Sequence, residues 1–258
     1  MRVNTLKRAA VAFALALPGA AIATVVAAPA AHADGCYTWN RNLYQGRSGS
    51  DVRQLQIRIA GWAGYRDIVE NDGIFGPKTA AAVRRFQQAY GLRADGVAGP
   101  QTYGKLYELQ DNDCTPRHFS FTELDDGCGR SGWSGGPRPA AETRENALRN
   151  MWKLEALRRS LGDKPLNISS GFRSQTCNNR VGGASDSQHL YGNAADVTSR
   201  NSSLCQVARE ARNHGFSGIY GPGYPDHDDH VHVDSRRENN RDDSSNTTSW
   251  SAPDCGVR

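Results

Sequence analysis

The sequence predicts an α+β protein of two domains: a small three-helix bundle followed by a mixed α+β domain. Two observations indicate this division. A turn-and-helix motif occurs twice in the N-terminal half, and the C-terminal half alternates helix-like with strand-like segments. A chain of 258 residues is also long enough to bury a core in each domain.

Residues 1–33 are predicted to be a removable targeting segment and not part of the fold. The basic stretch MRVNTLKRAA is followed by the apolar run VAFALALPGAAIATVVAAPA and the small-residue site AHA. Pro18 and Pro29 interrupt the run, which favours cleavage after Ala33 over a membrane anchor. No other apolar stretch approaches the roughly 18 residues that a membrane span requires. We therefore expect a secreted protein that is soluble once this signal peptide is removed.

Removal of the signal peptide brings the net charge close to zero. The full chain has 31 Lys and Arg against 27 Asp and Glu, and residues 1–33 hold three of the basic residues and none of the acidic ones. A nearly neutral chain lacks the basic surface with which proteins bind nucleic acid. We therefore expect no nucleic-acid partner and no membrane partner. Because nothing in the sequence indicates an oligomer, we expect a monomer.

The six cysteines are predicted to form three disulfides. All lie beyond the cleavage site, and none forms a C-x-x-C pair, which argues against zinc ligation by cysteine. Many pairings are possible, and the sequence alone does not choose among them. Consecutive pairing is attractive because it would bracket the first domain and tie the polar tail 235–254 to the core. The pairs would then be Cys36–Cys114, Cys128–Cys177 and Cys205–Cys255.

The first domain, residues 34–114, contains an internal repeat. DGIFGPKTAAAVRRFQ (72–87) and DGVAGPQTYGKLYELQ (95–110) share Asp, Gly, Gly, Pro, Thr and Gln at matching positions. Each copy predicts a turn, a proline at the first helical position and a short helix. A third helix is predicted in GSDVRQLQIRIA, with Ser50 as its cap. The apolar faces are Val52, Leu55 and Ile59, then Val83, Phe86 and Tyr90, then Tyr103, Leu106 and Leu109.

A linker or loop is predicted over residues 115–140, which are rich in Gly, Pro, Ser and Asp. The second domain, 141–258, is predicted to open with a long helix from Glu142, because leucines recur every three or four residues until Gly162. The later elements are strands in PLNISS (165–170), AADVTS (194–199), GIYG (218–221) and HVHVD (230–234), and a helix in SLCQVAREARNHG (203–215).

Histidine and aspartate gather at two places in the second domain. His189 and Asp196 flank Gly192, and HDDHVHVD (227–234) supplies more of both residue types. A catalytic zinc site takes three such ligands and leaves one position for water. His230 and His232 would share a face of a strand, so one could be a ligand while the other faces the substrate. The alternative is a solvated polar surface; a calcium site is disfavoured because calcium prefers oxygen ligands.

The repeat in the first domain resembles the peptidoglycan-binding domain type 1 family. LQ…DGIFGPKTAAAVRRFQ…GLRADGVAGPQT is close to that family's whole signature, and the resemblance runs from about Arg41 to Leu109. It implies a three-helix module that binds the cell wall and has no catalytic role. It does not say which residues contact the wall.

The second domain resembles the zinc D-alanyl-D-alanine carboxypeptidases, which share a fold with hedgehog domains. The motifs are SGFRS (170–174), S-x-H-x-x-G-x-A-x-D (187–196) and H-x-H (230–232), in that order, and the resemblance covers about 115–258. It implies one Zn²⁺ per chain. The implied zinc ligands are His189, Asp196 and His232. Arg173 would contact the substrate and steady negative charge, and Ser187 would lie near the substrate.

The resemblance leaves the acid–base group open. Some relatives have a carboxylate three residues before the last ligand, which is Asp229 here, and others have a histidine two residues before it, which is His230. His227 is a third candidate.

The activity that the resemblance implies is removal of the C-terminal D-alanine from D-Ala-D-Ala stem peptides of peptidoglycan, by a secreted, cell-wall-associated enzyme. Two alternatives stay open. One is an endopeptidase that cuts elsewhere in the stem peptide or cross-bridge with the same metal ligands. The other is a wall-binding protein without catalysis, in which the zinc site is structural or lost.

Overall fold

The computed structural model describes residues 35–125, 131–239 and 248–258. The predicted signal peptide, 1–33, lies outside these residues. The described chain has the expected class: a helical first domain precedes a mixed α+β domain built on one sheet. No helix within the described ranges is long and apolar enough to cross a membrane.

The first domain contains three α-helices, and two of them begin with proline as the repeat predicts. Helix α1 spans Ser50–Arg58, α2 spans Pro77–Ala89 and α3 spans Pro100–Leu109, with a short helix η1 at Ala60–Trp62. Ser50 is not the cap of α1: the N-cap is Gly49, and Ser50 is the first helical residue. The predicted apolar stripe Val52, Leu55 and Ile59 is fully buried.

The sequence repeat is also a repeat of hydrogen bonds. Gln56 and Gln87 are buried glutamines whose side chains bridge the turn and the start of the following helix. The amide of Gln56 donates to Asp72 Oδ1, the Ile74 carbonyl and Thr79 Oγ1, and its oxygen accepts from the Gly73 amide. Gln87 makes the same four bonds to Asp95, Val97, Thr102 and Gly96. The shared motif residues therefore hold the bundle together.

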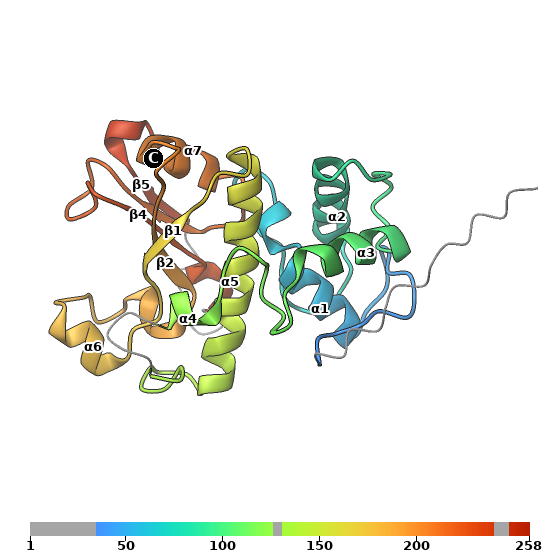
Figure 1. Ribbon diagram of the computed structural model, residues 1–258, viewed down its shortest axis with the longest axis horizontal. Helices are drawn as coiled ribbons and strands as arrows, with labels where there is room; N and C mark the ends of the chain where they lie inside the picture. Colours follow the sequence, from blue (N-terminus) through green and yellow to red (C-terminus); the bar gives the residue numbers. More distant parts are fainter. Residues whose placement is uncertain (1–34, 126–130, 240–247) are drawn as a thin grey trace, which may run out of the picture. The chain divides into compact units, whose positions relative to one another are not determined.

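The second domain is built on a five-stranded sheet in the order β1-β2-β4-β3-β5 (Figure 1). All neighbouring strands are antiparallel except β3 and β5, which are parallel. The strands are β1 Asn167–Ser170, β2 Ala194–Thr198, β3 Gly218–Tyr220, β4 Val231–Asp234 and β5 Ser249–Ser251. The helices are α4 Phe121–Leu124, α5 Ala140–Ser160, α6 Gln175–Arg180, η2 Gln188–Tyr191, α7 Leu204–Ala211, α8 Arg236–Asn239 and η3 Pro253–Cys255.

Two polar segments contribute more to the core than the sequence indicates. The predicted linker 115–140 contains α4 and buries Phe119, Leu124 and Trp133 in the core of the second domain. In the tail 235–254, Trp250 joins the same core because β5 pairs with β3. A few large apolar side chains are enough to anchor these segments, although their average composition is typical of a loop.

A buried ion cluster joins helix α5, helix α8 and the first domain. The Glu238 carboxylate accepts hydrogen bonds from Lys153 Nζ and Arg149 Nε, both at 2.5 Å. Arg149 also donates to the carbonyls of Gln56 and Val69 in the first domain. All three charged side chains are at least nine-tenths buried. Because a buried charge is costly unless it is paired, this cluster fixes the start of α8 against α5.

Two of the three predicted disulfides are present, Cys36–Cys114 and Cys205–Cys255. Cys177 is also disulfide-bonded, and its predicted partner, Cys128, lies outside the described residues.

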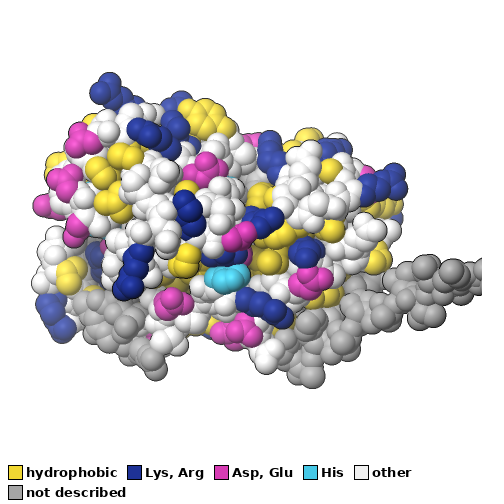
Figure 2. Space-filling view, turned by 45° about the horizontal axis from the view of Figure 1, so that its top comes forward, with side chains coloured by type: hydrophobic (Ala, Val, Ile, Leu, Met, Phe, Trp, Pro, Cys, Tyr) yellow, Lys and Arg dark blue, Asp and Glu magenta, His cyan; other side chains and the backbone are white. Residues whose placement is uncertain are grey.

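On the molecular face in Figure 2, basic and acidic side chains are interspersed. This face therefore carries no broad patch of one sign.

Candidate metal centre and active site

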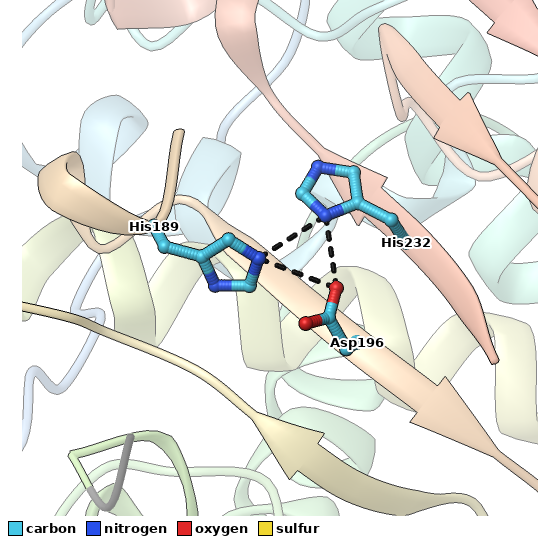
Figure 3. Close-up of side chains that lie close together, drawn as sticks. All are labelled: His189, Asp196 and His232. Carbon is cyan, nitrogen blue, oxygen red and sulfur yellow. Dashed lines mark hydrogen bonds and ion pairs between the residues drawn. The ribbon is translucent and has the colours of Figure 1, made fainter. Parts of the chain in front are cut away.

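Three side chains from three elements converge in the second domain (Figure 3). His189 comes from η2, Asp196 from β2 and His232 from β4. His232 Nδ1 lies 2.9 Å from Asp196 Oδ1 and 3.1 Å from His189 Nε2, and His189 Nε2 lies 3.2 Å from Asp196 Oδ1. Asp196 and His232 are direct partners across the antiparallel β2–β4 pair, so the sheet itself places them together.

The turn at Gly192 brings His189 back toward Asp196. Gly192 has φ 73°, in the left-handed region that favours glycine. A Cβ at this position would lie 2.4 Å from the carbonyl oxygen of Thr143 on α5. The motif glycine is therefore required both by the backbone angle and by the close packing of the turn on α5.

The donor set and its dimensions fit zinc. Two imidazole nitrogens and one carboxylate oxygen are the ligand types of catalytic zinc sites. Zinc–ligand bonds of about 2.0–2.2 Å in a tetrahedral arrangement place the ligand atoms about 3.3 Å apart. The three distances observed here, 2.9 to 3.2 Å, are close to that value. One zinc ion would thus be held by three protein ligands, with a fourth position left for water or substrate.

Each of the three side chains is oriented by a partner on its other side. His189 Nδ1 donates to the carbonyl of Gly171 at 2.5 Å, which turns Nε2 toward the cluster. Arg173 Nη2 donates to Asp196 Oδ2 at 2.8 Å, and Arg173 Nε donates to Ser170 Oγ. His232 Nε2 lies 3.1 Å from Asp234 Oδ2, so Nδ1 faces the cluster. Such outer partners fix the orientation that each metal-binding side chain needs.

Burial and mutual contact shift the pKa values of the three groups. Burial lowers the pKa of His189, which favours the neutral ring that binds metal. Burial opposes ionisation of Asp196, but the neighbouring histidines outweigh it and hold its pKa well below the usual range. Burial would lower the pKa of His232 as well, yet its bonds to Asp196 and Asp234 raise that pKa to about 9. In the metal-free protein, these contacts therefore favour the protonated form of the His232 ring.

The cluster lies in the wall of a cavity of about 700 Å³. Arg173, Ser187, His227 and His230 also line it, so the structure brings together most of the residues that the sequence singles out. Asp229 is the exception: among the described residues it is not part of the lining, and its side chain is 91% exposed.

His227 and His230 each have one ring nitrogen engaged outside the cluster. His230 Nδ1 bonds to Asp229 Oδ1 at 2.7 Å, and its Nε2 lies 3.6 Å from Asp196 Oδ1. His227 Nδ1 bonds to the Pro225 carbonyl at 2.7 Å. Burial lowers the pKa of His227 and so keeps its ring neutral near neutral pH. The two rings lie 4.8 Å apart, centre to centre, and both line the cavity.

The sequence reasoning missed four residues around the site. Tyr220, Tyr224 and Arg236 line the cavity, and Asp234 lies behind His232. Strand alternation contains a signal for Asp234, because it follows His232 by two residues and therefore shares its face of β4. Tyr220 could not be found in this way, because its position follows from pairing with His232 across β3 and β4.

Comparisons with known proteins agree with this geometry. The family described as peptidase M15 matches residues 117–234, and the family described as putative peptidoglycan binding domain matches residues 48–106. The zinc D-Ala-D-Ala carboxypeptidase of Streptomyces albus G is 52% identical over 258 residues, covering 94% of this chain and 96% of that protein. A probable N-acetylmuramoyl-L-alanine amidase of Bacillus licheniformis is 42% identical over 80 residues, covering 30% of this chain and 22% of that protein. The chain therefore belongs to the peptidase M15 family, with a peptidoglycan-binding domain ahead of its peptidase domain.

Proposed function

We propose that this protein is a zinc carboxypeptidase that removes the C-terminal D-alanine from D-Ala-D-Ala stem peptides of peptidoglycan. The observation that carries the proposal is the cluster of His189, Asp196 and His232 in the wall of a cavity that Arg173 also lines. The name of the Streptomyces albus G relative, which this chain matches over nearly its whole length, supplies the substrate.

The proposed zinc ligands are His189, Asp196 and His232. When bound, zinc lowers the pKa of a coordinated water and polarises a carbonyl group. Arg173 presents a permanent positive charge beside Asp196, at the cavity wall. A guanidinium with planar donors suits the negative charge that develops on the carbonyl oxygen during peptide hydrolysis. Ser187, at the N-terminal end of η2, is proposed to contact the substrate from the same wall.

The proton transfer is proposed to use His230 or His227. The reaction needs a group that accepts a proton from the attacking water and donates one to the leaving D-alanine nitrogen. His230 is supported by its distance of 3.6 Å from Asp196, and His227 by a ring that burial keeps neutral. Asp229 acts, in this proposal, only through its hydrogen bond to His230.

The first domain is proposed to hold the enzyme on peptidoglycan, as the matched family description indicates. The enzyme would then act outside the cell, associated with the cell wall, after removal of residues 1–33. It would work as a monomer, with no nucleic-acid or membrane partner.

The test is hydrolysis of diacetyl-L-Lys-D-Ala-D-Ala, with release of free D-alanine as the readout. We expect release by the zinc-loaded protein, and loss of release after chelation or with His189→Ala. The same peptide with a C-terminal amide separates the two peptidase classes. A carboxypeptidase should lose most of its activity on the amide, because it requires a free C-terminal carboxylate. An enzyme that cleaves internal bonds equally fast in the acid and the amide would instead be an endopeptidase. A folded, zinc-loaded protein that cleaves neither peptide nor cross-linked peptidoglycan would refute both.

A further inference from the structure

The carboxylate of Asp234 lies directly behind the metal-facing histidine His232. Asp234 is fully buried, and its Oδ2 is 3.1 Å from His232 Nε2. Arg236 holds the same carboxylate with its backbone amide, its Nε and its Nη2, at 2.5 to 3.1 Å. Three donor groups of Arg236 therefore fix the position of the carboxylate. In that position the carboxylate accepts a hydrogen bond from the ring N–H of His232.

Strand β3 leaves room for this carboxylate at Gly218. Gly218 is paired with Asp234 across β3 and β4. A Cβ at Gly218 would lie 2.1 Å from Asp234 Oδ2 and 2.4 Å from Oδ1. Any larger residue at this position would displace the carboxylate. The absence of a side chain at Gly218 thus allows the Asp234 carboxylate to occupy its position behind His232.

The segment after Asp234 is anchored from a second direction. Lys153 on α5 donates to Ser235 Oγ at 2.7 Å and to Glu238 in α8. Helix α8, which carries Arg236, is therefore held against α5 by the buried ion cluster described above. The anchoring restricts movement of both Asp234 and Arg236.

We propose that Asp234 is a positioning residue for the metal centre. Its carboxylate accepts a hydrogen bond from the N–H at His232 Nε2 and so directs Nδ1 toward His189 and Asp196, while Arg236 and Gly218 fix the carboxylate itself. A carboxylate behind a metal-binding histidine orients the ring and raises its basicity, and its loss typically weakens metal binding about 10- to 100-fold. This inference rests on the proposed zinc ligand set.

The experiment measures the zinc dissociation constant by competition with a chromophoric chelator, independently of activity. Asp234→Asn keeps the size of the side chain but removes its charge, and we expect zinc binding about 10- to 100-fold weaker than in the wild type. Gly218→Ala leaves Asp234 in the sequence but displaces its carboxylate, and we expect weaker zinc binding there too. Circular dichroism establishes that each variant is folded.

Two matched controls separate positioning from general destabilisation. Asp51→Asn breaks another aspartate–arginine pair, in which the aspartate is buried and its partner Arg41 is exposed, in the first domain. Gly104→Ala adds a methyl group to a glycine with open space around it. Both should bind zinc like the wild type. The inference would be overturned if folded Asp234→Asn bound zinc with wild-type affinity. If Asp234→Asn does not fold, wild-type affinity in folded Gly218→Ala would overturn it. A wild-type protein that binds no zinc would instead refute the ligand set.

Discussion

Arg173 and Asp196 form an ion pair within the candidate metal centre: Arg173 Nη2 lies 2.8 Å from Asp196 Oδ2. The other oxygen of the same carboxylate, Oδ1, faces His189 and His232. Asp196 thus links the proposed zinc site on one side to the proposed substrate-binding arginine on the other. A single carboxylate sets the position of the arginine relative to the metal.

Replacement of Arg173 should therefore separate catalysis from metal binding. At saturating zinc, we expect the kcat/KM of Arg173→Ala to fall about 10²- to 10³-fold, as is typical when a donor to a developing oxyanion is lost. The kcat/KM of Arg173→Lys should lie between those of the wild type and Arg173→Ala, because lysine keeps the charge without the planar donors. Arg180→Ala, on the exposed end of α6, is the matched control and should match the wild type. Unchanged kcat/KM in Arg173→Ala would refute the role.

The acid–base group can be assigned from the pH dependence of kcat. Loss of this group should lower kcat about 10²- to 10⁴-fold and remove one limb of the profile. We expect that result from either His227→Gln or His230→Gln. Asp229→Asn should cost less than either, because the Asp229 side chain is 91% exposed and acts through His230. If Asp229→Asn alone removed the limb, Asp229 itself would be the acid–base group.

The stability of the metal-free protein should depend on pH through His232. Its folded pKa is raised from 6.5 to about 9, because its bonds to Asp196 and Asp234 outweigh the effect of burial. The folded state therefore binds this proton more tightly than the unfolded chain does. The stabilisation is fully present below about pH 6.5 and is lost as the pH rises through about 9.

Urea unfolding of metal-free protein between pH 6 and pH 9.5 measures this effect. The His232→Gln variant should show a flatter dependence over that range. The control is His118→Gln, which alters a half-exposed histidine that pairs with Glu155, away from the cluster. An equally steep loss of stability in His232→Gln and the wild type would assign the effect to other groups.

Gln56 and Gln87, which make matching sets of hydrogen bonds, should contribute equally to the stability of the first domain. Gln56→Ala and Gln87→Ala each leave buried amide and carbonyl groups without their partner, and we expect each to cost about 1–3 kcal/mol of unfolding free energy. Gln101→Ala, an exposed glutamine on α3, is the matched control and should be close to neutral. Denaturant unfolding measures all three. A much smaller effect of one substitution would show that the two sets of hydrogen bonds are not equivalent.

The sequence predicted most elements because their signals are local. Pro77 and Pro100 mark the helix starts, and alternation in HVHVD marks the strand that carries His232. Segments that depend on distant partners were harder to predict. Trp250 lies in a polar tail, and only its pairing with β3 explains its burial.

In the site, too, residues with local signals could be predicted, and residues that depend on distant partners could not. Its motif residues could be named from the sequence, because the family resemblance includes them all. The support behind them could not, since Gly218 and Asp234 meet only when β3 and β4 pair. The position of Asp229 outside the cavity likewise depends on the conformation of the loop before β4, which the sequence of that loop does not specify.

One zinc ion, held by His189, Asp196 and His232, is proposed to support release of D-alanine. The most direct test adds zinc stepwise to metal-free protein while D-alanine release from diacetyl-L-Lys-D-Ala-D-Ala is followed. We expect activity to rise in proportion to added zinc and to level off at one zinc ion per chain, and we expect none with His189→Ala. Full activity in the metal-free protein, or in zinc-treated His189→Ala, would show that D-alanine release does not depend on this zinc site.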